Sequence, residues 1–337
     1  METAEKVKKS VPRYPPDTTD RRLDLAARAA WLSYEKHRTQ DQIAKEMQVS
    51  RQVVQRLMAL AHRSGLIEFR LNHVLKDCIE LAEALRDRYG LRYCDVAPNE
   101  SETIEDMATV GSLGARYLET ILPPNESFTL GVGNGRTMRE LSRRLDRREL
   151  PNCRCVSLMG NLTRDGKANN HDVVTWVAEA LGAQCYPRPM PIITNTAEEC
   201  RVLQAQPGYL SISGLIAEAG VLIMGMGFFG ARCSLLEDGF ITEAEARQAI
   251  AAGAVGEMLG FAIDQDGQFV DAEYHDRLTS YRQEPNQERP VVIVASGLQR
   301  AAAIIAACNG RLVNGLITDE NTARILLDEE RSKKGNR

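Results

Sequence analysis

The 337-residue sequence predicts an α/β protein with two parts, a small helical region near the N-terminus and a larger domain built on a mostly parallel sheet. Three observations support this. Closely spaced apolar residues between Ile43 and Leu57 fit two short helices that cross at a steep angle. From about residue 91, short β-like runs alternate with longer helical ones. Several of these runs end in glycine, as strands do when they lead into helices on a parallel sheet.

Composition excludes several classes of protein. Residues 1–19 are charged and rich in proline and contain no apolar segment of the kind a signal peptide needs, so we expect a flexible tail. No apolar run approaches the roughly 18 residues that cross a membrane. The eight cysteines form no CxxC pair and the five histidines form no metal-binding cluster. We therefore expect a cytoplasmic protein with reduced thiols and no metal or cofactor.

Residues 20–75 fit a helix-turn-helix domain, with a short β-wing after it. Ala44 is small where the second helix packs closely, and Val49 fills the turn. Ser50 is a favourable N-cap for the third helix. Gln48 takes the turn position where glycine is common, which costs conformational energy if φ is positive. The preceding supporting helix is expected to turn one face inward, made of Leu23, Ala27, Ala30, Trp31 and Tyr34.

Charge is distributed unevenly along the chain. Residues 1–75 carry 14 Lys/Arg against 9 Asp/Glu, whereas residues 76–337 carry 28 against 37. A basic head on an acidic body favours a polyanionic partner. Arg and Gln on the third helix suit the edges of guanine and adenine in the major groove. We expect operator DNA to be contacted by Ser50, Arg51, Gln52, Gln55 and Arg56, and by Arg70 from the wing. The alternative is an ordinary helical hairpin with a polar outer face.

Residues 76–90 repeat apolar residues at helical spacing, which predicts a linker helix that connects the domains or pairs two subunits. Residues 91–337 then form the larger domain. Strands are expected at 92–98, 128–133, 153–160, 221–227 and 290–297. Helices are expected at 104–122, 137–146, 172–182, 242–260 and 298–310, with a hairpin at 261–270. Ligands of such sheets lie beyond the carboxyl ends of the strands, where these glycines gather.

The loop GVGNGRTMREL, residues 131–141, is the main candidate for a ligand site. Its glycines allow a close approach of the backbone to a ligand. The helix that starts at Thr137 offers N–H groups and the positive end of its dipole. The spacing matches neither the dinucleotide fingerprint nor the P-loop, so nucleotide binding is disfavoured. The alternative is that the glycines only make a turn.

The chain resembles the SorC/DeoR-type bacterial transcriptional regulators, whose members respond to sugars or sugar phosphates. The resemblance covers nearly everything after the N-terminal tail. It is carried by the motifs DQIAKEMQVSRQVVQRLM, GVGNGRTM, VSLMGNL, LLEDGFITEAEARQAIAAGAVGEMLG, VASGLQRAAAI and GRLVNGLITDENTARILL.

This resemblance implies an effector domain similar to the sugar-phosphate isomerase and deaminase fold, without the catalysis. Glu257 would accept hydrogen bonds from effector hydroxyls. Arg300 stands where the family often has Lys, and so offers a planar fork in place of a point charge. Asp319 is a further candidate that could simply cap the last helix. The phosphate or polar end of the effector would lie against Gly133, Asn134, Gly135, Arg136 and Thr137, and beside Met159, Gly160 and Asn161.

The leading interpretation is a DNA-binding regulator of a carbohydrate or polyol catabolic operon, gated by a small sugar, polyol or sugar phosphate. One recognition helix reads few base pairs, so a homodimer is the minimum, and the resemblance favours a homotetramer. One alternative is an isomerase-like or deaminase-like enzyme with an accessory DNA-binding head. It would need a base and an acid at the sugar, and no His or second carboxylate recurs beside the loop motifs to join Glu257. A bare sugar-binding module would leave the head without a role.

Overall fold

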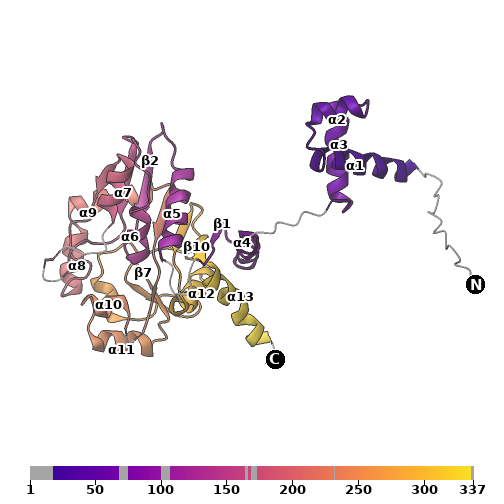
Figure 1. Cartoon of the computed structure of the whole chain (residues 1–337). Coiled ribbons are helices and arrows are strands. Elements are labelled where there is room, and N and C mark those ends of the chain that lie inside the picture. Colours follow the sequence, from indigo (N-terminus) through magenta and orange to yellow (C-terminus); the bar gives the residue numbers. More distant parts are fainter. Residues whose placement is uncertain are drawn as a thin grey trace, which may run out of the picture. The chain divides into compact units, whose positions relative to one another are not determined.

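The computed structural model describes residues 18–67, 75–99, 107–163, 166–167, 173–230 and 232–334. The chain divides into two compact units, Met1–Asn72 and His73–Arg337. Helices α1 to α3 belong to the first unit, and the strands belong to the second (Figure 1). The expected combination of a helical head and a larger α/β domain is confirmed. In the part of the chain that the structure describes, no helix is both long and apolar enough to span a membrane.

The head unit has the expected helix-turn-helix arrangement. Its helices are α1 Thr18–Tyr34, α2 Gln40–Glu46 and α3 Arg51–Arg63. Thr39 caps α2 in a reciprocal capping box with Gln42. The Ser50 hydroxyl accepts a hydrogen bond from the Val53 N–H at 3.3 Å and so caps α3, as its position predicted.

The helices of the head pack around a small apolar core. Ile43 and Val54 are fully buried where α2 crosses α3, and Leu57 is nearly so. The turn between these helices does need a left-handed residue, because Gln48 has φ of 53°. Residues 68–74, which include most of the expected wing and Arg70, lie outside the described residues.

The predicted inner face of α1 is wrong in part. Ala27, Trp31 and Tyr34 are exposed, and Leu23 is half-buried. The close contact between α1 and α3 leaves room mainly for small side chains, so the large rings lie outside it. Tyr34 instead hydrogen-bonds to His62 through its hydroxyl at 3.0 Å. The residues that α1 does bury are Ala26, Ala29, Ala30 and Leu32.

A parallel sheet organises the second unit, as predicted. Seven described strands form it in the order β1-β10-β9-β5-β2-β3-β4, and every neighbouring pair is parallel. Their bounds are β1 Tyr93–Ala97, β2 Phe128–Val132, β3 Cys153–Ser157, β4 Gln184–Tyr186, β5 Val221–Met224, β9 Val291–Val294 and β10 Gly315–Asp319.

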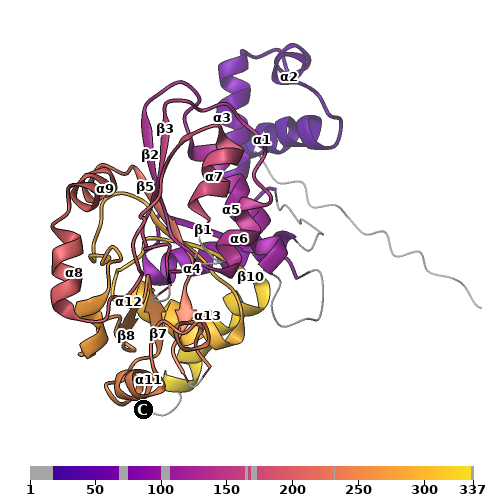
Figure 2. The same cartoon turned by 90° about the vertical axis from the view of Figure 1, so that its left-hand side faces the viewer.

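Helices cover both faces of this sheet (Figure 2). Alternate residues of each strand serve the two faces: Val221 and Ile223 pack on one side, whereas Leu222 and Met224 pack on the other. The first face is covered by α5 Met107–Ile121, α6 Arg136–Ser142 and α7 Val174–Leu181. The second is covered by α4 Leu75–Tyr89, α9 Pro207–Ala217, α12 Ala301–Asn309 and α13 Glu320–Lys334.

The expected linker helix is α4, and it is an integral part of the second unit. Leu85 is fully buried in the core that α4 shares with the sheet. The Tyr89 hydroxyl donates to the carbonyl of Leu326 at 2.9 Å, and Arg88 donates to that of Leu327 at 2.7 Å. These bonds fasten α4 to α13.

A small antiparallel sheet lies next to the main one and corrects one expectation. It consists of β6 Gly227–Phe228, β7 Gly256–Met258 and β8 Phe261–Ile263. The helix expected over 242–260 is only α11 Glu243–Ala251. It stops before Gly253, whose φ is 94°, so Glu257 lies on strand β7 and not on a helix. The hairpin expected within 261–270 is present: Ile263 and Phe269 form an antiparallel bridge, and Val270 donates its N–H to the carbonyl of Ala262 at 3.1 Å. Its first strand, β8, also pairs with β7.

Short elements complete the second unit. Two of them, α10 and the 3-10 turn η2, lie beside the site described below. The bounds of these elements are α8 Ala197–Gln204, α10 Ser234–Glu237, η1 Glu273–Arg277 and η2 Leu298–Arg300.

Candidate functional site

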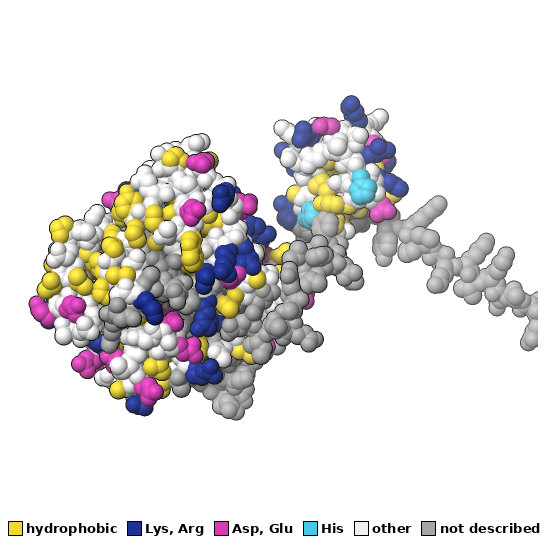
Figure 3. Space-filling view, turned by 60° about the vertical axis from the view of Figure 1, so that its left-hand side comes forward, with side chains coloured by type: hydrophobic (Ala, Val, Ile, Leu, Met, Phe, Trp, Pro, Cys, Tyr) yellow, Lys and Arg dark blue, Asp and Glu magenta, His cyan; other side chains and the backbone are white. Residues whose placement is uncertain are grey.

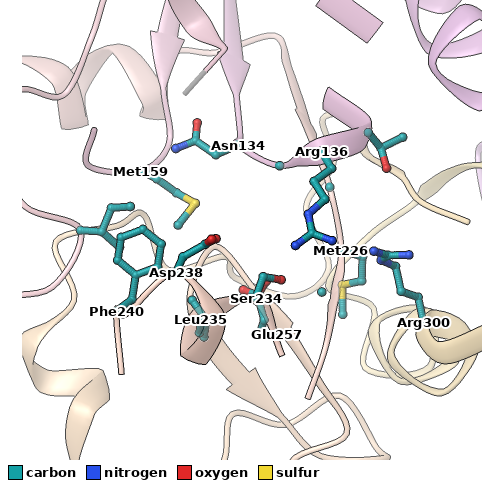
Figure 4. A pocket seen from close by; sticks show the side chains of 15 residues that line it. Asn134, Arg136, Met159, Met226, Ser234, Leu235, Asp238, Phe240, Glu257 and Arg300 are labelled. Atoms are coloured by element: carbon teal, nitrogen blue, oxygen red, sulfur yellow. The ribbon is translucent and has the colours of Figure 1, made fainter. Parts of the chain in front are cut away.

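A cavity of about 90 Å³ lies at the carboxyl ends of β2 and β5. It is closed on the other side by the small sheet and by α10 and the residues after it. This is the position at which open parallel sheets bind ligands. Polar and apolar side chains share the lining: Figure 4 shows Asn134 and Arg136 on one side of it, opposite Ser234, Asp238 and Glu257.

The glycine loop contributes four of its five predicted residues to the lining, namely Asn134 to Thr137. Gly135 precedes α6 with φ of 131°, and a Cβ there would meet open space. Gly133 has a packing role instead, because a Cβ at that position would lie 2.5 Å from the Cβ of Met224. The loop is therefore part of a cavity wall and not only a turn.

Asn134 has the least satisfied side chain of the loop. Both its amide nitrogen and its amide oxygen are buried without a hydrogen-bond partner in the structure. Leaving a buried polar group unpaired costs about 1–3 kcal/mol. Such an atom in a cavity wall is explained by a ligand or by water. Beside it, Thr137 is buried and Arg136 forms an exposed ion pair with Glu237 at 3.4 Å.

Glu257 and Arg300 also line the cavity, as predicted. One carboxylate oxygen of Glu257 accepts the N–H of Gly260 at 2.8 Å. Burial raises the pKa of this carboxyl, against the opposing effects of that hydrogen bond and the nearby charge of Arg300. Gly227 faces the other oxygen, and a Cβ there would collide with it. Arg300 itself donates to the carbonyl of Ser296 at 2.9 Å.

Three other predicted site residues lie outside the cavity lining. Gly160 packs against the backbone, since a Cβ there would be 2.6 Å from the carbonyl of Met190. Its neighbour Met159, which was also predicted, does line the cavity. The backbone N–H of Asn161 bonds to the segment that contains Met190. Asp319 is buried and accepts the N–H of Thr322 at 2.6 Å, which is a helix-capping role.

Sequence reasoning missed the residues that close the cavity from the opposite side. Ser234, Leu235, Asp238 and Phe240 come from α10 and the segment after it, and Met226 follows β5. Three of these residues belong to the motif LLEDGF, which is one of the motifs that carry the family resemblance. Nothing in its spacing places a four-residue helix opposite the glycine loop.

The residues of α3 that are predicted to contact DNA lie on its exposed face. Arg51, Gln52, Gln55 and Arg56 are all exposed, and Arg51 lies 3.6 Å from Asp41 in an exposed ion pair. Between residues 21 and 67 there are nine Lys/Arg and four Asp/Glu. Figure 3 shows Lys and Arg side chains spread over the visible face of the head.

A helix-turn-helix head followed by an α/β domain with a small polar cavity defines a ligand-responsive DNA-binding regulator. Residues 73–328 match the family described as "Putative sugar-binding domain", and the chain belongs to this family. It is a SorC/DeoR-type sugar-binding transcriptional regulator, of the class that governs carbohydrate and polyol catabolism.

Two curated relatives and two solved structures are similar over most of the chain. The chain is 34% identical to the erythritol catabolism regulatory protein EryD of Brucella abortus (strain 2308), over 92% of this chain and 98% of that one. It is 28% identical to the transcriptional regulator LsrR of Enterobacter sp. (strain 638), over 90% and 93%.

The solved structures share the fold. The full-length sorbitol operon regulator SorC from Klebsiella pneumoniae has a TM-score of 0.68 at 24% identity, covering 90% of this chain and 98% of that one. A domain of a possible sugar-binding transcriptional regulator from Arthrobacter aurescens TC1 has a TM-score of 0.68 at 23% identity, covering 74% and 97%.

Proposed function

We propose that this chain controls an operon for polyol or sugar use by binding operator DNA through α3 and a small polyol, sugar or sugar phosphate in the cavity beside Asn134. The observation that carries the effector site is the Asn134 amide, whose two polar atoms are buried without a partner in the cavity wall. A hydroxyl group both donates and accepts a hydrogen bond, so a polyol can satisfy both atoms.

The remaining polar groups fit the same class of ligand. Asp238 and Glu257 supply carboxylate oxygens for hydroxyl donors, and Arg136 and Arg300 supply donors for a hydroxyl, carbonyl or phosphate oxygen. The volume of about 90 Å³ favours a short-chain effector. EryD is named for erythritol, a four-carbon polyol, and we extend that substrate class to this chain.

The relatives support binding without turnover, because EryD and LsrR, which match over nine-tenths of this chain, are named as regulators. The cavity holds two carboxylates, Asp238 and Glu257, and the second accepts the N–H of Gly260. We infer that the chain is a regulator and not an enzyme, and that it works in the cytoplasm as a homodimer or homotetramer.

A thermal-shift screen tests the effector assignment. Erythritol, other four- to six-carbon polyols and sugars, and their phosphates would be added singly to the full chain. A ligand that binds only the folded state raises the melting temperature by mass action. A compound that raises it should also change operator binding in a gel shift. Turnover of such a compound, or no response to any of them, would contradict the proposal.

A matched pair of variants assigns the response to this cavity. Asn134→Ala and Thr137→Val remove polar groups from the lining and should weaken effector binding about tenfold or more, because each loses a hydrogen bond to the ligand. Thr129→Val is the control: its hydroxyl is also buried but has no partner and does not line the cavity. Equal responses in all three variants would place the effector elsewhere.

A further inference from the structure

A second cavity, of about 580 Å³, lies in the same unit and shares no lining residue with the effector cavity. Its walls come from the segment after β4, from α8 and α9, and from η1 and the residues that follow it. Figure 2 shows α8 and α9 next to each other at the left-hand edge of the second unit. The residues used below are Arg188, Arg201, Tyr209, Asp276, Ser280 and Arg282.

The side chain of Arg188 is the unusual feature of this cavity. Only 1% of the residue is exposed, and it is the largest fully buried side chain in the described part of the chain. Its guanidinium donates to the carbonyl of Thr279 and lies 4.7 Å from the ring of Tyr209. Its Nε has no hydrogen-bond partner, and no carboxylate pairs with it among the described residues.

Burying a charge without a counterion is expensive, so a buried guanidinium is normally paired. The carbonyl of Thr279 and the side chain of Tyr209, which meets the guanidinium through its ring and through a hydrogen bond, are neutral groups and compensate only in part. Ser280, at 4% exposure, also lines the cavity and has a hydroxyl without a partner. Two buried donors that lack an acceptor therefore line one cavity.

The rest of the lining is electropositive as well. Arg201 and Arg282 are exposed residues of the lining, and Asp276 is the one carboxylate among the lining residues. His275 is neutral at pH 7, since burial and the charge of Arg282 lower its pKa to about 4. Arg201 pairs with Glu198 at 3.1 Å, in a contact exposed to solvent and therefore weak.

We propose that this cavity is a second ligand site, which binds a small oxyanion, a carboxylate or phosphate group of a metabolite, on Arg188 and Ser280. The guanidinium fork matches two oxygens of either group, and the serine hydroxyl donates to one of them. Arg201 and Arg282 attract the anion to the cavity. The site is separate from the effector cavity and nothing in the proposed polyol response requires it.

The test is a titration of the full chain with inorganic phosphate, and separately with malonate, at an ionic strength held constant with sodium chloride. The melting temperature of the wild type should rise with at least one of these anions and reach saturation. The two arms distinguish a tetrahedral phosphate from a planar carboxylate ligand. Arg188→Gln should remove most of that rise in melting temperature, because it removes the positive charge and the paired N–H donors of the guanidinium.

Two further variants make the result decisive. Ser280→Ala removes a hydroxyl that makes no bond in the structure, so it should fold normally and weaken the anion at least threefold. The Ser280→Ala variant tests the anion site even if Arg188→Gln does not fold. Arg247→Gln removes one exposed charge from the surface of the same unit, at a residue paired only with Glu243, and should leave the anion response unchanged.

Three results would overturn the proposal. One is a wild type that responds to neither anion. Another is a response that Arg188→Gln and Ser280→Ala leave intact. The third is a change of oligomeric state in Arg188→Gln when the wild type itself does not respond to either anion, which would mean that another copy of the chain fills the cavity.

Discussion

The protonation of Glu257 depends on its burial in the cavity wall. Burial is the largest influence and raises its pKa above the ordinary 4.5. The folded state therefore holds the proton more tightly than the unfolded state does, so stability falls with rising pH between the two pKa values. The stabilisation of the folded state by this carboxyl is complete below the pKa that the group has in the unfolded chain. It is lost as the pH rises through the pKa that the group has in the folded protein.

Replacing the Glu257 carboxyl by an amide should remove this loss of stability at high pH. We expect Glu257→Gln to melt at a higher temperature than the wild type at pH 7, because an amide has no charge to desolvate and its oxygen still accepts the Gly260 N–H. The difference should disappear below about pH 4, where both states of the wild type are protonated. Melting curves across this range measure it, with the exposed Glu243→Gln as control. A less stable variant at pH 7 would show that the charged form is favoured by its neighbours.

At the scale of secondary structure, the turn between α2 and α3 is strained at one residue. Gln48 has φ of 53°, a conformation that costs a non-glycine residue roughly 1 kcal/mol. Gln48→Gly should therefore stabilise the head by roughly 0.5 kcal/mol, since the extra freedom of glycine in the unfolded chain offsets part of the gain. Gln52→Gly, inside α3, should destabilise it by about 1 kcal/mol. Amide hydrogen exchange of α2 and α3 reports both, and the expectation fails if the two variants change it in the same direction.

The elements show where sequence patterns suffice and where they do not. Strands such as β5 are continuous apolar runs that end in glycine, and these were predictable because a central parallel strand is buried on both faces. The helix predicted over 242–260 ends at Ala251, because Gly253 has φ of 94°, which an α-helix does not accommodate. Gly256 is required by tertiary packing, since a Cβ there would lie 2.3 Å from the Cβ of Ala303. A single sequence does not reveal such a contact.

The same distinction applies to the candidate site. Asn134 and Thr137 were found because a strand, a glycine turn and a helix start are adjacent in the sequence. Glu257 and Arg300 were found through family motifs alone. Ser234 and Asp238 come from a helix of four residues, whose position opposite the loop depends on long-range packing. For Asp319 the sequence left two roles open, effector contact and helix cap, and its hydrogen bond with the Thr322 N–H is that of a cap.

Helix α3 carries the prediction about DNA. Replacing Gln52 or Arg56 by Ala should weaken binding to the cognate operator by roughly 1–3 kcal/mol, because each exposed side chain can bond to a base edge. Fluorescence anisotropy with the promoter fragment measures this, and affinity for unrelated DNA should fall much less for Gln52→Ala. Arg247→Ala, which removes a charge from the other unit, is the control. Equal affinity of all variants for the operator would exclude α3 as the reading helix.

At the scale of the whole molecule, the two units have separate cores. The head buries its own cluster around Ile43 and Val54, and the α/β unit starts with α4, whose Leu85 is in the core of that unit. Regulation then requires the effector to bind one arrangement of the assembled chains better than another. Such a coupling is typically about 1–3 kcal/mol, or roughly 5- to 150-fold in operator affinity.

This division predicts that a chain starting at His73 folds and binds effector without the head. Leu85, Tyr89 and their partners on α13 are all retained, so the α/β unit keeps its core and the cavity beside Asn134. The truncated chain should show the same effector-induced rise in melting temperature as the full chain, and no binding to the operator. A second truncation that starts at Leu91 removes α4 and should lower the melting temperature strongly, because it exposes the apolar surface that Cys78 and Leu85 cover. If the chain starting at His73 is unfolded, or binds the operator as tightly as the full chain, the proposed division of DNA binding and effector binding between the two units is wrong.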